Sequence, residues 1–293
     1  MWIVYAILTF FLWGIADLFY KKGNIDNDKY SHLKTGIMVG LVMGIHAIIY
    51  YFVKGIKFDF MALIKYLPVS ICYIASMIIG YKGLKYVNLS ISSPIQNSSG
   101  LITSLLLALI FHVKLSIWEI ICLIIMAIGV ILLSVIENKK DIKVALKRIT
   151  VAVIIFPLIY CLIDGLGTFL DAVYLDHLEL IDEDMALLSY EFTFLIYGII
   201  SFIILKAKKV KIKIKEEKNR LSAAIFETMG QFTYVFAISS HSVITAPIVA
   251  CYSALSVLLS RIFLKEKITK LQYFALFLIF LSIIMLAILE EIM

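Results

Sequence analysis

Acidic side chains interrupt long apolar segments of this sequence, and two of them follow helical spacing. Asp164 and Asp171 stand seven residues apart within residues 149–175, so a helix would place both on one face. Tyr160 and Thr168 share that face. Such a polar stripe can line a cavity that binds a polar solute, although Asp171 could instead be solvated near the end of its segment.

A second polar stripe consists of Glu227, Gln231 and Tyr234, which recur at positions i, i+4 and i+7 of one helix face. A carboxylate beside an amide and a phenol can hydrogen-bond a polar substrate. A carboxyl group inside an apolar segment can also take up and release a proton, which makes Glu227 and Asp164 candidates for proton coupling. The structural alternative is that Glu227 is the buried ion partner of Arg261 or of a lysine.

Trp13 and Asp17 form a third candidate pair, because Trp13-x-x-x-Asp17 resembles Tyr160-x-x-x-Asp164 further along the chain. An aromatic ring beside a carboxylate attracts a cation through the electrons of the ring face. The pairs therefore favour a cationic or zwitterionic substrate over an anion. The alternative for Asp17 is an ion pair with the lysines that follow it one turn later.

Two proline-containing apolar segments, residues 87–111 and 243–264, are rich in short hydroxyl side chains. Proline removes one backbone donor, and the carbonyls and hydroxyls left nearby can line a cavity or support close helix packing. Both interpretations stay open for these segments. If they line a cavity, Ser93, Asn97 and Tyr252 are the candidate substrate contacts.

Three further ionisable residues within apolar segments are weaker candidates. His46 stands in the middle of its segment and is expected to be a structural residue with a satisfied ring, and Glu191 lies early in its own segment. Arg261 is the one basic residue well inside an apolar segment. We expect it to form an internal salt bridge, with an anion clamp as the alternative.

Composition shows which solvent these segments need. Of the 293 residues 62% are apolar and only 16% are charged, whereas about 25% is usual for a soluble domain. The mean hydropathy of +1.00 indicates a multi-pass protein of the cell membrane. Ten apolar runs are long enough to span it as helices: residues 2–20, 36–53, 61–81, 87–111, 116–136, 149–175, 185–205, 221–240, 243–264 and 268–290.

The ten predicted helices divide into two similar halves. Pro94 and Pro247 lie 153 residues apart near the start of corresponding segments, and the same offset pairs Tyr81 with Tyr234. The predicted halves are therefore residues 1–137 and 149–293, with residues 138–148 as a charged linker. Because five is an odd number of spans, the second half must be inverted relative to the first.

Three stretches resemble the EamA-like family of the drug/metabolite transporter superfamily: Trp13-Gly14, "GYKGLKYVNLSISSPIQNSSGLITSLLLALIF" and "LSRIFLKEKITKLQYFALFLIFLSIIMLAI". The resemblance implies an all-α, ten-helix 5+5 fold with a central cavity, in a carrier that exports amino acids and other metabolites or takes up small solutes. The first half departs from the pattern, since Val113 stands where Glu266 would be mirrored. Glu266 is therefore not expected to belong to a symmetric functional pair.

Charge patterning bears on the orientation of the chain. Most of its 27 Lys and Arg residues lie in the odd-numbered connections, which would place those connections in the cytoplasm and both termini outside. The family resemblance implies cytoplasmic termini instead. The basic run at residues 206–220 indicates a connector that contacts anionic membrane lipid, and nucleic acid is not expected as a partner. Both a monomer and a homodimer stay open.

The sequence predicts a secondary carrier for an amino acid, an amine or a similar small polar metabolite, working by alternating access. Uptake of a sugar or nucleoside is the alternative, and a membrane-embedded lipid-modifying enzyme or a scramblase is the rival class. Asp182-Glu183-Asp184 is the one acidic cluster such an enzyme could use, and no enzyme activity is expected. The chain has no GxxxxGK[ST] motif, and its four cysteines lack CxxC spacing, so we expect no cofactor and no metal.

Overall fold

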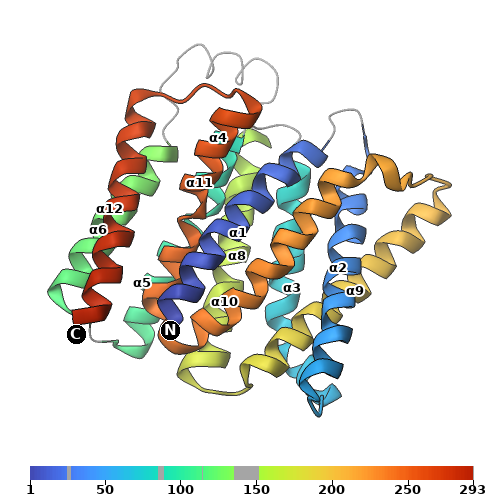
Figure 1. Ribbon diagram of the computed structural model, residues 1–293, viewed down its shortest axis with the longest axis horizontal. Helices are drawn as coiled ribbons and strands as arrows, with labels where there is room; N and C mark the ends of the chain where they lie inside the picture. The colour runs from blue at the N-terminus through green and yellow to red at the C-terminus, as the bar shows by residue number, and fades with distance from the viewer. Residues whose placement is uncertain (25–27, 85–88, 114, 135–151, 293) are drawn as a thin grey trace.

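Every regular element in the described part of the chain is helical. The computed structural model describes residues 1–24, 28–84, 89–113, 115–134 and 152–292. Among these residues, helices account for all elements in Figure 1. Their bounds are α1 (Trp2–Gly23), α2 (Ser31–Lys54), α3 (Phe60–Gly83), α4 (Leu89–Gln96), α5 (Ser99–Phe111), α6 (Ile117–Ser134), α8 (Ala152–Ala172), η1 (Val173–His177), α9 (Glu183–Ala207), η2 (Ile214–Glu216), α10 (Lys218–Ala250), α11 (Tyr252–Leu259), η3 (Ser260–Leu264) and α12 (Lys270–Ile292).

Length and hydropathy make most of these helices able to cross a membrane. Within the described residues, eight helical stretches are long and apolar enough, and Ile117–Leu133 is a shorter apolar helix. One of the eight, Lys218–Leu264, is 47 residues long, which is about twice what one crossing needs. The chain is thus an all-helical membrane protein, with fewer separate spans by these criteria than the ten apolar runs.

The 47-residue stretch is not one straight rod. His241 leaves the helical region with φ −156° and ψ 63°, so α10 consists of two parts that meet at this residue. Figure 1 shows the chain turning there, at the lower end of the view, and rising again toward α11. The apolar runs at 221–240 and 243–264 therefore correspond to the two arms of this stretch.

Two further interruptions occur at matching positions in the halves. The break between α4 and α5 follows Pro94 by a few residues, and the break at Cys251 between α10 and α11 follows Pro247 at the same spacing. Each proline lacks an N–H group and interrupts the local helical hydrogen bonding. The predicted run at 87–111 is therefore two helices, α4 and α5.

Helices that are distant in the sequence pack side by side. The pairs in closest contact are α1 with α10, α2 with α9, α3 with α8, and α6 with α12. Glycine lets the backbones of α2 and α9 come close together. A Cβ at Gly40 on α2 would lie only 2.4 Å from the carbonyl oxygen of Phe194 on α9, so a larger residue would not fit there. The first three helices of the chain therefore each pack against a helix of the second half of the sequence.

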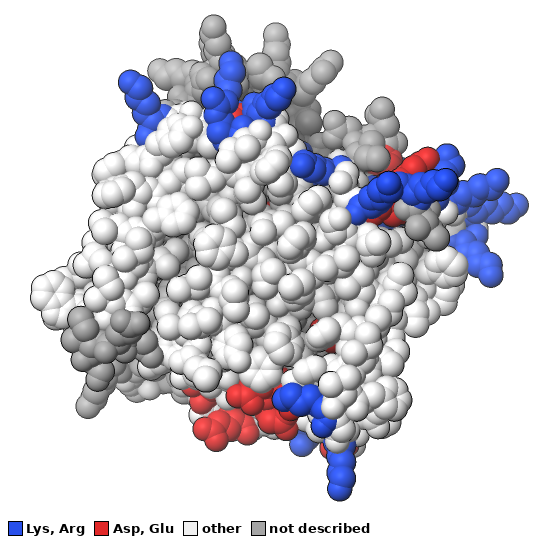
Figure 2. Space-filling view, in the orientation of Figure 1, with Lys and Arg blue, Asp and Glu red and all other residues white. Residues whose placement is uncertain are grey.

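Charged side chains gather at the two ends of the bundle and leave a broad apolar belt between them (Figure 2). Large apolar side chains are exposed midway along the helices, among them Ile196, which is 48% exposed, and Ile284, which is 56% exposed. Lys and Arg dominate the upper end in this view, while acidic residues gather at the lower end, where both termini lie. This distribution suits a protein whose belt contacts lipid.

Candidate functional site

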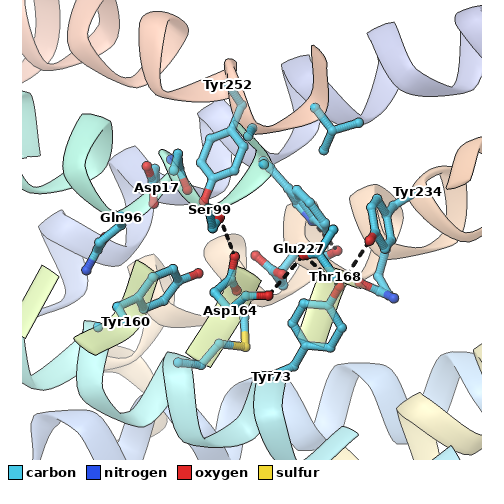
Figure 3. A pocket seen from close by; sticks show the side chains of 18 of the residues that line it. Asp17, Tyr73, Gln96, Ser99, Tyr160, Asp164, Thr168, Glu227, Tyr234 and Tyr252 are labelled. Carbon is cyan, nitrogen blue, oxygen red and sulfur yellow. Dashed lines mark hydrogen bonds between the residues drawn. The ribbon is translucent and has the colours of Figure 1, made fainter. Parts of the chain in front are cut away.

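A pocket of about 810 Å³, counting the part open to its surroundings, lies at the centre of the bundle. Residues from α1, α3, α4, α5, α8, α9, α10 and α11 line it, so both halves of the chain contribute (Figure 3). The predicted candidates that line it are Trp13, Asp17, Asn97, Tyr160, Asp164, Thr168, Glu227, Gln231, Tyr234 and Tyr252.

Ser93 does not line the pocket but holds one of its carboxylates. Its hydroxyl donates to Oδ2 of Asp17 at 2.6 Å, and Ser256 donates to the same oxygen at 2.8 Å. Asn97, between α4 and α5, donates in turn to the Ser93 hydroxyl at 3.1 Å. The lysine one turn after Asp17, Lys21, donates to the carbonyl oxygen of Leu84. Hydroxyl groups of α4 and α11 therefore fix the carboxylate of α1.

Asp164 has a similar environment in the other half. Ser99 donates to its Oδ2 at 2.9 Å, and Ser76 donates to its Oδ1 at 3.3 Å. Gly165 follows it, and the hydroxyl of Thr103 donates to the Gly165 carbonyl at 3.0 Å. Asp17 and Asp164 thus each accept hydrogen bonds from two serines on neighbouring helices, which agrees with the similarity of their sequence surroundings.

Glu227 supplies a third carboxyl group from α10 and is 7% exposed. Its backbone carbonyl accepts a hydrogen bond from Trp13 Nε1 at 3.3 Å. Arg261 is not its partner, because the Arg261 side chain is exposed on η3 and donates to the carbonyl of Glu266 at 3.4 Å. The expectation of an internal salt bridge for Arg261 was therefore wrong: its position near the end of the stretch lets it reach the polar end of the bundle.

Trp13 provides an aromatic wall between the carboxyl groups. Its ring centroid lies 5.0 Å from that of Tyr234 and 5.7 Å from that of Tyr252. The indole fits directly against Gly230, where a Cβ would approach the ring carbon Cδ1 to 2.4 Å. Gly230 is required by this close approach, and the sequence alone did not identify it.

Asp171 is fully buried, which corrects the alternative that it is solvated at a helix end. Tyr66 donates to its Oδ1, and Tyr73 donates to its Oδ2 at 3.3 Å. The hydroxyls of Tyr73 and Tyr234 are 3.0 Å apart, and Tyr73 also lies 3.2 Å from the hydroxyl of Thr168. We call Asp171, Tyr66, Tyr73 and Tyr234 the tyrosine cluster. Its members Tyr73 and Tyr234 line the pocket, and Asp171 and Tyr66 lie nearer the end that carries the termini.

Tyr66 and Tyr73 were not predicted as site residues, although the sequence contains a signal for them. They stand seven residues apart on α3, so they share the face that meets Asp171 on α8. Other lining residues gave no comparable pattern: Tyr20, Met77, Gly80, Tyr81, Leu84, Gln96, Ser99, Gly100, Tyr190, Ala246, Val249 and Ala250. Of these, Gln96 has a buried Nε2 without a hydrogen-bond partner among the described residues, as does the predicted Gln231.

A buried arginine lies at the opposite end of the bundle. Arg220 is 2% exposed and pairs with Glu217, and its Nη2 donates to the Ser31 hydroxyl at 2.7 Å. Asp28 lies 3.6 Å from Arg220 and 2.8 Å from Lys34. These five residues form the ionic cluster. The interpretation of residues 206–220 as a purely surface connector was thus wrong at its last turn, where α10 begins and packs on α1 and α2.

The electrostatics of the ionic cluster appear in Asp28, which lies in the connection before α2. Partial burial alone would raise the pKa of this carboxyl group. The hydrogen bond and charge of Lys34, the N–H of Tyr30 and the charge of Arg220 outweigh that effect, so the pKa of Asp28 is below its usual value. The carboxylate is therefore stabilised in its charged form by the positions of its neighbours.

Remaining candidates have structural partners away from the pocket. His46 Nδ1 lies 2.7 and 2.8 Å from the two carboxylate oxygens of Glu191, which is fully buried, in agreement with a satisfied histidine. In the acidic cluster, Asp182 caps α9 by accepting from the N–H of Met185 at 2.8 Å. Asp184 accepts a 2.6 Å bond from the hydroxyl of Tyr50.

Comparison with known proteins finds a matching family model and matching solved structures. The sequence model of the "EamA-like transporter family" matches residues 1–135 and again residues 151–288. A solved structure titled "Crystal structure of protein" superposes with a TM-score of 0.69 at 12% identity, covering 98% of this chain and 96% of the other. That similarity shows a shared fold. No curated protein matches the chain.

Proposed function

Because the chain belongs to the EamA-like transporter family, we propose that it is a secondary carrier that moves a small polar metabolite across the cell membrane by alternating access. The observation that supports this most is the central pocket, where Asp17, Asp164 and Glu227 meet at the contact between the two halves. Carriers built from inverted repeats bind their substrate at this contact. The costly burial of three carboxyl groups is explained if they bind a solute.

Two inverted repeats of five crossings are part of this proposal. The family model matches each half once, which supports an internal repeat. The break at His241 divides the 47-residue stretch into two arms that are each long enough for a crossing. With the shorter helix Ile117–Leu133 and the seven other spans, the chain then crosses the membrane ten times.

Alternating access also needs a closure on each side of the pocket, and the two named clusters lie where such closures belong. The tyrosine cluster joins α3 to α8 and α10 on the side of the termini. The ionic cluster joins the start of α10 to α2 and to the connection before it, on the Lys- and Arg-rich side. In our proposal, each cluster opens in turn while the other stays formed.

The positive-inside bias supports one orientation. Lys and Arg side chains gather at the end opposite the termini (Figure 2), so we place that end in the cytoplasm and both termini outside. A tag on either terminus should then be accessible on intact cells. Tags that react only after permeabilisation would reverse the orientation and leave the carrier function unaffected.

Proton coupling through Asp164 and Glu227 is the energy source we propose. Both carboxyl groups lie in membrane helices and line the pocket, where substrate and proton can compete for them. Neutralising both residues should abolish accumulation driven by a proton gradient, while exchange without a gradient is reduced less. Uptake that is unchanged when the gradient is collapsed would remove the coupling hypothesis.

The carrier function is tested by counterflow with purified protein in liposomes. Vesicles are loaded with one unlabelled solute from a panel of amines, amino acids, sugars and nucleosides, and entry of the same labelled solute is followed. Trans-stimulated entry that is absent from protein-free vesicles supports the proposal. Phospholipid scrambling without solute counterflow would contradict it.

A further inference from the structure

We infer that the pocket selects organic cations, namely small amines that carry an ammonium group without a carboxylate. This inference rests on the proposed carrier function and concerns its substrate class. Among the described residues that line the pocket, three are carboxylic acids, Asp17, Asp164 and Glu227, and none is Lys, Arg or His. The site therefore offers several partners for a positive group and no side-chain cation for a negative one.

Among the described residues, no Lys, Arg or His forms an ion pair with Asp17, Asp164 or Glu227. Asp17 and Asp164 accept hydrogen bonds from serine hydroxyls, which orient a carboxylate but do not neutralise it. Lys21 lies near one edge of the pocket, where it donates to the carbonyl of the lining residue Leu84. Buried charges are usually paired, so a bound ammonium group completes this site.

Aromatic rings complete the recognition of such a cation. Trp13 lies between Tyr234 and Tyr252, at centroid distances of 5.0 and 5.7 Å. Tyr160 and Tyr190 also line the pocket. Trp and Tyr faces attract ammonium groups, and they also pack against the apolar body of an amine. A sugar would use the hydroxyl and amide groups but would gain nothing from the surplus of carboxylates.

The side-chain amides of Gln96 and Gln231 indicate which hydrogen-bond acceptors a substrate can carry in addition to its ammonium group. Buried Nε2 groups of Gln96 and Gln231 have no hydrogen-bond partner among the described residues. They can donate to a hydroxyl, a carbonyl or water. A carboxylate would accept these bonds too, but it would stand among three acidic side chains and be repelled by them. The geometry therefore favours an amine over the amino acid from which it differs by one carboxylate.

Matched solute pairs test this inference. Tyramine and tyrosine differ by the carboxylate alone, as do 1,5-diaminopentane and lysine. We expect each amine to show at least tenfold faster counterflow than its amino acid in liposomes near pH 6, where the amines are protonated and leak least. Protein-free vesicles give the background. An amino acid that moves as fast as its amine overturns the inference.

Isosteric variants assign the selectivity to the pocket. Glu227→Gln and Asp17→Asn should each lower tyramine counterflow at least tenfold, and the ratio of tyramine to tyrosine should fall. Glu216→Gln is the control, because Glu216 is 59% exposed in an ion pair with Lys213 outside the pocket. Unchanged selectivity in both folded pocket variants overturns the inference, and the wild-type solute pairs decide the matter if the variants do not fold.

The outcomes separate the inference from the function on which it rests. If a sugar or a zwitterionic amino acid undergoes counterflow and amines do not, the chain is a carrier and the substrate class is wrong. If no solute in the panel shows trans-stimulated entry, the proposed carrier function fails and the substrate class fails with it.

Discussion

Gly230→Ala tests whether the close packing of Trp13 shapes the pocket. An ideal Cβ at Gly230 would lie 2.4 Å from Cδ1 and 2.5 Å from Nε1 of the indole. Carbon atoms in contact prefer at least about 3.5 Å, so the ring must move by about 1 Å or more. The indole stands between the α10 backbone and the tyrosine rings of the pocket, so this shift narrows the site and weakens its hydrogen bond to Glu227.

The size of the effect follows from two opposing terms. Overpacking a well-packed site costs roughly 1–3 kcal/mol, whereas Ala is favoured over Gly inside a helix by about 1 kcal/mol. Gly230→Ala should therefore lower the free energy of unfolding by about 0–2 kcal/mol. Substrate affinity should fall about tenfold, because loss of about 1.4 kcal/mol of contact energy has that effect.

Gly165→Ala is the matched control on α8. A Cβ there would meet Ser99 atoms no closer than 3.4 Å, which is an ordinary contact. This variant should be stabilised by roughly 0.5–1 kcal/mol through helix propensity alone. Thermal unfolding in detergent and the half-saturation concentration for counterflow measure both variants. If the two alanines behave alike, the argument that Gly230 exists to seat the indole is refuted.

Three further variants test the regions around the pocket. The pKa of Asp28 is lowered in the folded protein, so this carboxylate stabilises the fold above the unfolded pKa of about 3.9, and that contribution is lost as the pH falls through the lower folded value. Asp28→Asn should therefore reduce the acid-dependent loss of stability by less than about 1 kcal/mol, and an unchanged pH–stability curve would contradict this. Tyr66→Phe removes one donor to buried Asp171 and should cost about 1–3 kcal/mol in thermal unfolding, whereas no loss would mean that the bond contributes nothing. His46→Ala leaves buried Glu191 without its partner and should destabilise by about 3 kcal/mol with little change in substrate affinity, and an affinity loss would place this pair in the binding site.

Most of the polar residues that interrupt apolar segments at helical spacing line the central pocket in the structure. Asp164 with Thr168, and Glu227 with Gln231 and Tyr234, reach the same pocket although they come from different helices. The reason is physical: in a membrane helix a polar face has to avoid lipid, so its direction is constrained by the sequence alone.

Residues near the ends of segments were harder to predict. Asp171 lies a few residues before an acidic connection, and Arg220 ends a basic run, so composition indicated solvent for both. In the structure Asp171 is buried under two tyrosines of α3, and Arg220 is buried against α2. Their burial depends on which distant helix packs on them, and local sequence does not contain that information.

The asymmetry of the two clusters has a consequence for the proposed transport cycle. Ser31 of the ionic cluster donates to Asn24 at 2.8 Å, and Asn24 and Asp171 lie 147 residues apart, as do Asp17 and Asp164. In the proposed repeats, the two clusters therefore occupy corresponding positions. Identical inverted halves would give the inward-open and outward-open states nearly equal free energies. Here one closure is made of ion pairs around Arg220 and the other of phenols around a single carboxyl group. Because the two clusters are built from different interactions, we expect their free energies of formation to differ. The empty carrier should then favour one state, and substrate binding has to offset that bias.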